Sequence, residues 1–307
     1  MNSATREAFG NALAELGAIN PRIVSLDADL SCTTKSATFA KKFPERFFNM
    51  GIAEADLMAT AAGLATCDKI PFASTFAVFA SCRALDQIRN SICYPHLNVK
   101  VVGTHAGPSC GEDGGSHQAV EDIAIMRSLP SMVVVVPADD VEAEKVVYAA
   151  AEYYGPMYLR FARLASPTVH DEDYEFDLFR GEVMRDGSDV AIIACGMMVP
   201  RALDAAEQLA AEGINARVVN MHTVKPIDAD LVEDCARTCG KIVTIEEGTI
   251  VGGLGTAVCE VVADRCPVPV RRIGMPDIFG KSGAGAELLD EFGLTAEHII
   301  EEVHALA

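Results

Sequence analysis

Short apolar runs alternate with longer amphipathic stretches along the whole chain, a pattern that predicts strands alternating with helices. In the first half, strands are predicted at 23–27, 71–75, 99–104, 132–137 and 157–161, and helices at 5–16, 53–65, 78–93 and 140–153. The runs at 99–104 and 132–137 are almost continuously apolar, which is typical of strands buried on both faces of a parallel sheet. The sequence therefore predicts an α/β fold with right-handed crossovers.

An acidic stretch without clear periodicity, at 164–185, interrupts this alternation. Beyond it, strands are predicted at 189–194, 216–221, 242–246 and 268–273, with helices at 200–211, 229–239 and 255–263. We therefore predict two domains, at 1–166 and 187–307, joined by a linker at 167–186.

Composition and charge narrow the classes of function. Half of the 307 residues are hydrophobic, which is enough to bury two cores. The net charge of −19 argues against a nucleic-acid or anionic-membrane partner, because such a partner needs a positive protein surface. The N-terminus lacks the apolar segment of a signal peptide, and the longest apolar runs are too short to cross a bilayer, so we expect a cytoplasmic protein. The ten cysteines include no CxxC pair, and no metal site is predicted in this chain.

Three segments of the first half carry candidate chemistry. Glu54 begins a helix whose other residues are mostly small and apolar. A carboxylate in the first turn of a helix interacts favourably with the helix dipole, so the position of Glu54, taken alone, does not require a functional role. Phe76 and Phe79 follow a strand three residues apart, a spacing that is more often core than cofactor site. The glycine-rich loop at 103–118 contains two histidines and two acids beyond a buried strand, where α/β proteins place their sites. A core does not need such a loop, which therefore predicts a site of unspecified chemistry.

Together, in this order, these segments resemble the pyrimidine-binding domain of thiamine-diphosphate enzymes, and the transketolase family most closely. The resemblance covers essentially the whole chain. It rests on Ala-Asp-Leu at 28–30, Gly-Ile-Ala-Glu at 51–54, Ser-Thr-Phe-x-x-Phe at 74–79, Gly-Glu-Asp-Gly-x-x-His-Gln at 111–118, and Glu-Glu-Gly at 246–248 followed by Ile-Val-Gly-Gly-Leu-Gly at 250–255. It implies a parallel-sheet domain that binds the pyrimidine of thiamine diphosphate, followed by a transketolase-type C-terminal α/β domain.

The resemblance also implies roles at the cofactor. Glu54 matches the glutamate that shares a proton with a pyrimidine ring nitrogen and so activates the cofactor, which makes it a catalytic residue. Phe79, with Phe76 beside it, matches the aromatic wall that stacks on the pyrimidine, and Asp29 matches an aspartate near the cofactor at the subunit interface. The chain departs from the family at Cys82, where transketolases often have a tyrosine, so the resemblance does not assign this part of the aromatic wall.

For the substrate, the resemblance implies a sugar phosphate. His117 matches a catalytic histidine that contacts the hydroxyls and carbonyl of the donor, and Asp113 matches an aspartate that reads a sugar hydroxyl. The phosphate end is expected to be held by four residues: Arg6, Thr33, His105 and Arg163. Arginine suits this task because its planar fork binds phosphate bidentately. Arg160 is out of strand alternation with Arg163, so its role stays open.

One motif of the family is missing from this chain, and its absence implies a partner chain. In the family, a module with Gly-Asp-Gly and a later asparagine holds the diphosphate through Mg²⁺ or another divalent ion, and this chain has no Gly-Asp-Gly. We therefore expect this chain to be the second subunit of a split transketolase of carbohydrate metabolism, in the pentose phosphate pathway. It is expected to share thiamine diphosphate with an N-terminal subunit in a heterotetramer. The C-terminal domain is assigned to self-association, and its glycine run at 252–255 to a tight turn rather than a phosphate site.

Other interpretations remain. The beta subunit of a 2-oxoacid dehydrogenase has the same two domains on a separate chain, but is not expected to carry the loop at 111–118. Deoxyxylulose-phosphate synthase is also similar, but tends to have arginine where His105 stands and is normally one polypeptide. A specialised transketolase that acts on an unusual sugar phosphate is the alternative that differs least from the main interpretation. A non-catalytic regulatory or interaction subunit would have been favoured by the loss of Glu54 or His117, and both are present.

Overall fold

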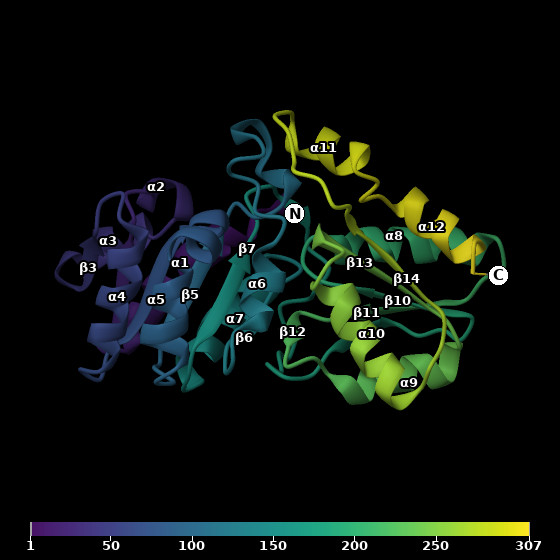
Figure 1. The fold of residues 1–307 in the computed structure, drawn as a ribbon, viewed down its shortest axis with the longest axis horizontal. Helices are drawn as coiled ribbons and strands as arrows, with labels where there is room; N and C mark the ends of the chain where they lie inside the picture. Colours follow the sequence, from purple (N-terminus) through teal and green to yellow (C-terminus); the bar gives the residue numbers. More distant parts are fainter. Residues whose placement is uncertain (1, 307) are drawn as a thin grey trace.

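The computed structural model describes residues 2–306 and shows two α/β domains side by side (Figure 1). The first domain surrounds a seven-stranded sheet of order β12-β6-β7-β5-β4-β2-β3, in which only β12 is antiparallel to its neighbour. Its strands are β2 (Ile23–Asp27), β3 (Phe47–Asn49), β4 (Ile70–Phe76), β5 (Lys100–Thr104), β6 (Val133–Val135), β7 (Met157–Phe161) and β12 (Thr223–Lys225).

Helices cover both faces of this sheet, which is why β2, β4, β5, β6 and β7 are buried along their whole length. One face packs against α1 (Thr5–Ile19), α3 (Ala37–Lys42) and α7 (Asp140–Glu152), and the other against α4 (Glu54–Ala65) and α6 (Asp122–Ser128). The neighbours Val101 and Val102 of β5 belong to these two opposite cores. Short elements complete the domain: β1 (Asn2–Ser3) paired with β8 (Ser166–Pro167), α2 (Ser31–Thr34), α5 (Leu85–Gln87), and the 3-10 turns η1 (Pro44–Arg46) and η4 (Pro108–Asp113).

The second domain contains a five-stranded sheet of order β14-β13-β10-β11-β9, parallel except for β9. Its strands are β9 (Glu182–Arg185), β10 (Val190–Ala194), β11 (Ala216–Asn220), β13 (Ile242–Thr249) and β14 (Val270–Met275). Helices α8 (Met198–Ala211) and α12 (Ala296–His304) pack on one face, and α9 (Ala229–Cys239) and α10 (Leu254–Arg265) on the other. Helix α11 (Gly285–Glu291) reaches back over the first domain and contacts η4 (Figure 1).

Three local features differ from the sequence-based expectation. The acidic stretch contains β9, whose half-exposed residues form an edge strand and therefore lack a strong apolar pattern. Strand β12 belongs by sequence to the second domain but pairs with β6 of the first sheet, so the chain crosses between the domains twice more. The segment 78–93, predicted as one helix, is instead η2 (Phe79–Arg83) and η3 (Ile88–Cys93), two π-helical turns with α5 between them.

One backbone hydrogen bond defines the π-helical turn η2. The amide of Ala84 donates to the carbonyl of Phe79, five residues back, at 3.2 Å. The side chains of Phe79 and Arg83, four residues apart, lie on the same side of this turn. Among residues 2–306, no helix is both long and apolar enough to span a membrane.

Candidate active site

The candidate site lies where the parallel strands of the first sheet end. An open cleft of about 460 Å³ is lined by Arg6, Cys32, Thr33, Lys35, Phe76, His105, Asp113, His117 and Arg163. All six residues that were predicted to bind substrate line this cleft, although they are spread from residue 6 to residue 163. The carboxyl ends of parallel strands meet at one edge, and this edge collects them because β4, β5 and β7 end at Phe76, Thr104 and Phe161.

One end of the cleft is positively charged. Arg6 donates through Nη1 to the carbonyl of Thr33 at 2.8 Å and contacts Nε2 of His105 at 3.0 Å. Burial and then the nearby charges of Arg6, Arg163 and Lys35 lower the pKa of His105 to about 3. His105 is therefore neutral at physiological pH, and the cationic character of this end comes from the arginines and Lys35.

The turn that carries Thr33 is held from inside. Asp27, at the end of β2, is buried and accepts hydrogen bonds from Thr34 Oγ1 at 2.7 Å, Ser36 Oγ at 2.9 Å and the amide of Leu30 at 2.5 Å. Burial raises the pKa of Asp27, while these three hydrogen bonds favour its charged form. The short helix α2 is thus fixed at the cleft by a carboxylate that the sequence analysis did not single out.

The glycine-rich loop supplies the other side of the cleft. Arg163 donates to the carbonyl of Cys110 at 2.6 Å and to Oδ2 of Asp113 at 3.1 Å. His117 lies edge-on to Phe79, with ring centroids 5.4 Å apart, and its Nδ1 is 3.0 Å from Ser116 Oγ. The loop therefore presents an imidazole and a carboxylate to the same space as the cations.

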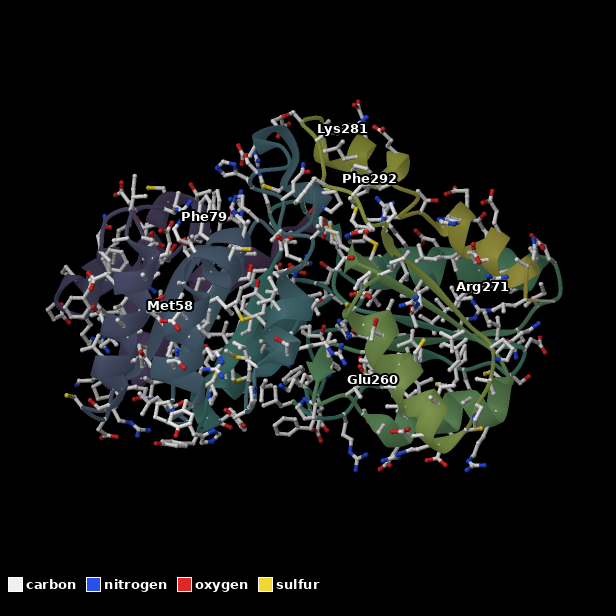
Figure 2. All side chains as sticks on the ribbon, in the orientation of Figure 1. Met58, Phe79, Glu260, Arg271, Lys281 and Phe292 are labelled. Atoms are coloured by element: carbon white, nitrogen blue, oxygen red, sulfur yellow. The ribbon has the colours of Figure 1, made fainter. Side chains whose placement is uncertain are left out.

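A chain of rings connects this cleft to the second half of the candidate site. Phe76 stacks on His105 with centroids 4.2 Å apart, and Phe79 lies nearly parallel to Phe76 at 5.7 Å. Figure 2 shows Phe79 near the upper edge of the first domain in that view, above the buried Met58 of α4. Phe79 is half-buried, so part of its ring stays accessible at this edge.

Glu54 lies beyond Phe79, at the first turn of α4. Its side chain is only 2% exposed, and Oε1 accepts a hydrogen bond of 2.8 Å from Nη1 of Arg83. The guanidinium carbon of Arg83 also lies 4.5 Å from the centroid of Phe79. Arg83 is 54% exposed, so Glu54 stands one side chain away from solvent rather than in a closed interior. Sequence reasoning missed Arg83, although its spacing of four residues from Phe79 within a predicted helix places both side chains on one helix face.

Asp29 is the one predicted cofactor residue that contacts neither the cleft nor Glu54. It is exposed, adopts φ +65°, and its Oδ1 accepts from Nδ2 of Asn49 at 3.0 Å. Asn49 also accepts from the amide of Gly51, in the turn that leads into Glu54. The structure therefore links Asp29 to the start of α4 through Asn49.

The second domain holds the glycine-rich loop in place. Glu247 of β13 accepts from the amide of Ser109 at 2.8 Å, and Gln118 donates to the carbonyls of Gly111 at 3.0 Å and Lys281 at 2.8 Å. Arg160 is buried between the domains, where it binds Asp122 at 2.8 Å and the carbonyl of Glu247 at 2.7 Å. Arg160 is thus a structural clamp and not a member of the cleft.

Comparisons with known proteins identify the family of the two domains. The family model for the transketolase pyrimidine-binding domain matches residues 2–168, and that for the transketolase C-terminal domain matches residues 180–299. The chain belongs to the transketolase family. A protein of Methanocaldococcus jannaschii named "Putative transketolase C-terminal section" is 48% identical over 301 residues, which cover 97% of this chain and 94% of that protein.

Two further relatives show how the chain relates to whole transketolases. A solved structure described as "Split gene transketolase, inactive beta4 tetramer" is 54% identical with a TM-score of 0.93, covering 99% of this chain and 98% of that chain. Transketolase of Rattus norvegicus is 40% identical over 307 residues, which cover 99% of this chain but 49% of that protein. The chain is therefore a transketolase-type subunit that spans about half of a single-chain transketolase, and the expected two-domain α/β fold is confirmed.

The glycine run of this transketolase C-terminal domain serves packing, as the sequence analysis favoured. The start of α10 is filled by the side chain of Glu246, which accepts from the amides of Leu254 at 2.8 Å and Gly255 at 2.9 Å. Burial raises the pKa of Glu246 to about 7. A Cβ on Gly253 would overlap Oε2 of Glu246, so this carboxylate leaves no room for a side chain there.

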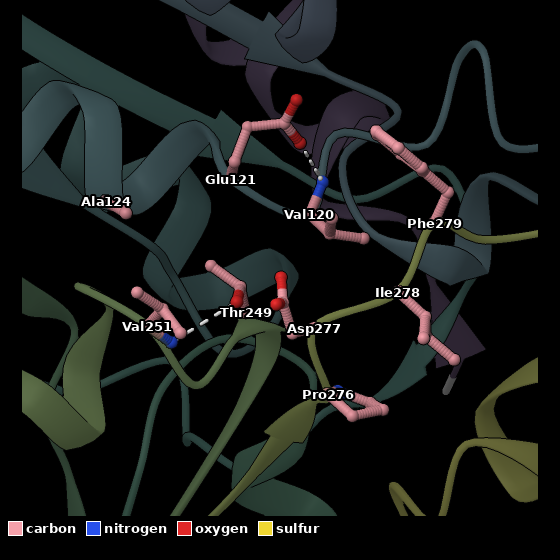
Figure 3. Close-up of a pocket in the computed structure, with 9 residues that line it drawn as sticks. All are labelled: Val120, Glu121, Ala124, Thr249, Val251, Pro276, Asp277, Ile278 and Phe279. Atoms are coloured by element: carbon pink, nitrogen blue, oxygen red, sulfur yellow. Dashed lines mark hydrogen bonds between the residues drawn. The ribbon is translucent and has the colours of Figure 1, made fainter.

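A second hollow lies between the domains. It has a volume of about 370 Å³ and is lined by Val120, Glu121, Ala124, Thr249, Val251, Pro276, Asp277, Ile278 and Phe279 (Figure 3). Three of these apolar side chains are well exposed: Val251, Ile278 and Phe279. The lining has two acids and no cation, so it does not suit an anionic substrate. Among residues 2–306, no group of three or more histidines, cysteines or acids is placed to hold a metal ion.

Proposed function

We propose that this chain is the second subunit of a split, thiamine-diphosphate-dependent transketolase, which moves a two-carbon ketol unit between sugar phosphates only together with a partner chain. The observation that carries the proposal is the continuity of the site. A cleft with a cationic end and polar loop residues runs through stacked rings to a buried carboxylate at a helix start. A sugar phosphate and the ring of a cofactor can be held side by side along such a path.

The residues at the Glu54 end fit an aminopyrimidine. The ring needs a carboxylate that is shielded from water and an aromatic face to stack on, and Glu54 and Phe79 provide these. The two residues lie close enough together for the single side chain of Arg83 to contact both. Glu54 would share a proton with a ring nitrogen, and Phe76 and Phe79 would form the wall. When bound, thiamine diphosphate supplies the carbon nucleophile and the electron sink that two-carbon transfer requires.

The residues of the cleft act on the substrate. Arg6, Arg163 and Lys35 attract and orient a terminal phosphate, and neutral His105 donates or accepts a hydrogen bond there without adding charge. Asp113 and His117 face the sugar hydroxyls from the loop, where His117 would hold the donor in position and exchange protons with its oxygens. Asp29 would act near the interface, through its contact with the turn before α4.

The diphosphate and its metal belong to the partner in this proposal. A divalent ion needs hard oxygen ligands, and the sequence offers no Gly-Asp-Gly. Single-chain transketolases of about twice this length support a partner that is equivalent to their other half. The tetramer of the split-gene relative supports self-association of this chain, and its inactivity supports a need for the partner. We propose a heterotetramer with its active sites between chains, working in the cytoplasm.

Co-assembly tests the proposal. The chain is mixed with a candidate partner that carries Gly-Asp-Gly, and ketol transfer between sugar phosphates is measured with and without thiamine diphosphate and Mg²⁺. Transfer is expected only when both chains, the cofactor and the ion are present. Release of carbon dioxide from pyruvate by the same mixture would instead favour a 2-oxoacid dehydrogenase or a deoxyxylulose-phosphate synthase. A mixture that binds thiamine diphosphate no better than the partner alone contradicts the proposal.

A further inference from the structure

Arg83 makes both contacts that a bound aminopyrimidine would need. Its Nη1 donates to Oε1 of Glu54 at 2.8 Å, and its guanidinium carbon lies 4.5 Å from the centre of the Phe79 ring. A guanidinium and an aminopyrimidine are both flat, delocalised groups with N–H donors at the rim, so one can replace the other in a slot between a carboxylate and a phenyl face. Both cannot occupy these contacts at once.

The two members of the pair differ in their freedom to move. Glu54 is 2% exposed and is fixed at the start of α4, whereas Arg83 is 54% exposed. A buried carboxylate without a partner is costly, but an arginine can swing its head into water and keep its charge solvated. If one member leaves when a ligand arrives, it is therefore Arg83.

We propose that Arg83 is a stand-in for the pyrimidine ring: it pairs with Glu54 and covers Phe79 in the cofactor-free chain, and it withdraws when the ring binds. This inference rests on the proposed function, because the ring it describes is that of thiamine diphosphate. It gives Arg83 a positioning role, since it keeps Glu54 aimed at the ring position before the partner and cofactor arrive. It also means that cofactor binding must first break an ion pair.

Removal of Arg83 should then destabilise the isolated chain but strengthen cofactor binding by the assembled enzyme. In the isolated chain, Arg83→Met leaves Glu54 buried without its partner, and the melting temperature is expected to fall by roughly 3 °C. In the assembled enzyme, the same change removes the competitor of the ring, and the dissociation constant for thiamine diphosphate is expected to fall about tenfold. An arginine that directly held the cofactor would give a weaker complex instead.

Calorimetric titration of the assembled enzyme with thiamine diphosphate measures the second effect. Arg89→Met is the matched control, because Arg89 lies on the same helical segment, is exposed, and donates through its side chain to the neighbouring Asn90, so its loss removes the same charge without touching Glu54. Arg83→Lys keeps the charge without the flat fork, and it is expected to retain the melting temperature and to bind the cofactor with intermediate affinity.

The isolated chain provides a readout without cofactor. The Glu54→Gln change is expected to restore most of the melting temperature lost in Arg83→Met, because no buried charge is then left unpaired. Equal or weaker cofactor binding by Arg83→Met, with normal binding by the wild type, overturns the inference and leaves the proposed function standing. Failure of the wild-type assembly to bind thiamine diphosphate overturns both.

Discussion

The two ends of the candidate site are built in different ways. The cationic end is completed within this chain: Arg6 is bonded to Thr33 and His105, and the loop opposite is clamped by Glu247 and by Gln118, which bonds Lys281. At the other end, Glu54 pairs with the half-exposed Arg83, and Figure 2 shows the neighbouring Phe79 near the upper edge of the first domain.

This difference suggests a division of work. A preorganised cleft binds its ligand without having to order its side chains during binding. The Glu54 end, in contrast, holds a side chain, Arg83, that a ligand can displace. In the proposed assembly, the substrate end would be ready in the free subunit, and the cofactor end would form only with the second chain. Four changes can break or sharpen this comparison.

The largest effect is expected at the cofactor end. Glu54→Gln keeps the shape of the side chain but removes the carboxylate that is proposed to share a proton with the cofactor, so turnover of the assembled enzyme should fall by roughly a hundredfold or more. Steady-state ketol transfer measures the loss, and Asp56→Asn, on an exposed position of the same helix, is the control. Near-normal turnover in Glu54→Gln would refute the role of Glu54.

A smaller effect is expected at the cationic end. Arg6→Met removes the charged donor that is proposed to bind the substrate phosphate, and KM for a sugar phosphate should rise about tenfold to a hundredfold while kcat changes little. Arg22→Met, which loses only an exposed ion pair with Asp68, should leave KM unchanged. The difference between Arg6→Met and wild type should vanish for a sugar without phosphate; if it persists, Arg6 does not read the phosphate.

The clamp from the second domain should matter less than the groups it positions. Gln118→Met has a similar volume but loses the donors to Gly111 and Lys281, so the loop with Asp113 and His117 becomes less ordered. We expect kcat/KM to fall by roughly tenfold, because misplacement of positioning groups has effects of this order. Gln208→Met on the exposed face of α8 is the control. Unchanged kinetics in Gln118→Met would show that the loop is ordered without the second domain.

The smallest effect concerns stability at a domain contact away from the site. Burial by itself lowers the pKa of His170, but hydrogen bonds with Asp139 and Glu182, both at 2.9 Å, outweigh it and raise the pKa to about 10. Because the folded pKa lies above the unfolded value, this stabilisation is complete below about pH 6.5 and is lost as pH rises towards 10.

Thermal melts between pH 6 and 10 measure this dependence. The melting temperature of the wild type should fall by several degrees over this range, and that of His170→Gln should fall less. His304→Gln is the control, because His304 pairs with Glu212 at the surface. A His170→Gln melt with the same slope as the wild type would show that another group causes the loss.

The comparison also separates what could be predicted from what could not. The six predicted substrate residues of the cleft were found because their motifs resemble those of a family, and three of them, Thr33, His105 and Arg163, follow strands that the apolar pattern predicts. Arg83, Lys35 and Cys32 were missed. Arg83 lies four residues after Phe79 in a helical segment, so that contact follows from helical spacing, but its ion pair with Glu54 joins two elements that are far apart in sequence. Lys35 follows the turn that Asp27 fixes through Thr34.

The sequence by itself determined the alternation of elements, the two sheets with helices on both faces, and the chemical types at the strand ends, because these depend on local patterns of apolar and polar residues. Only the tertiary structure decided which distant groups meet: Arg160 with Asp122, Gln118 with Lys281, and Arg83 with Glu54. All three pairs join residues that are far apart in sequence and lie on different elements or domains. Contacts of this kind arise from packing of whole elements, which no short stretch of sequence encodes.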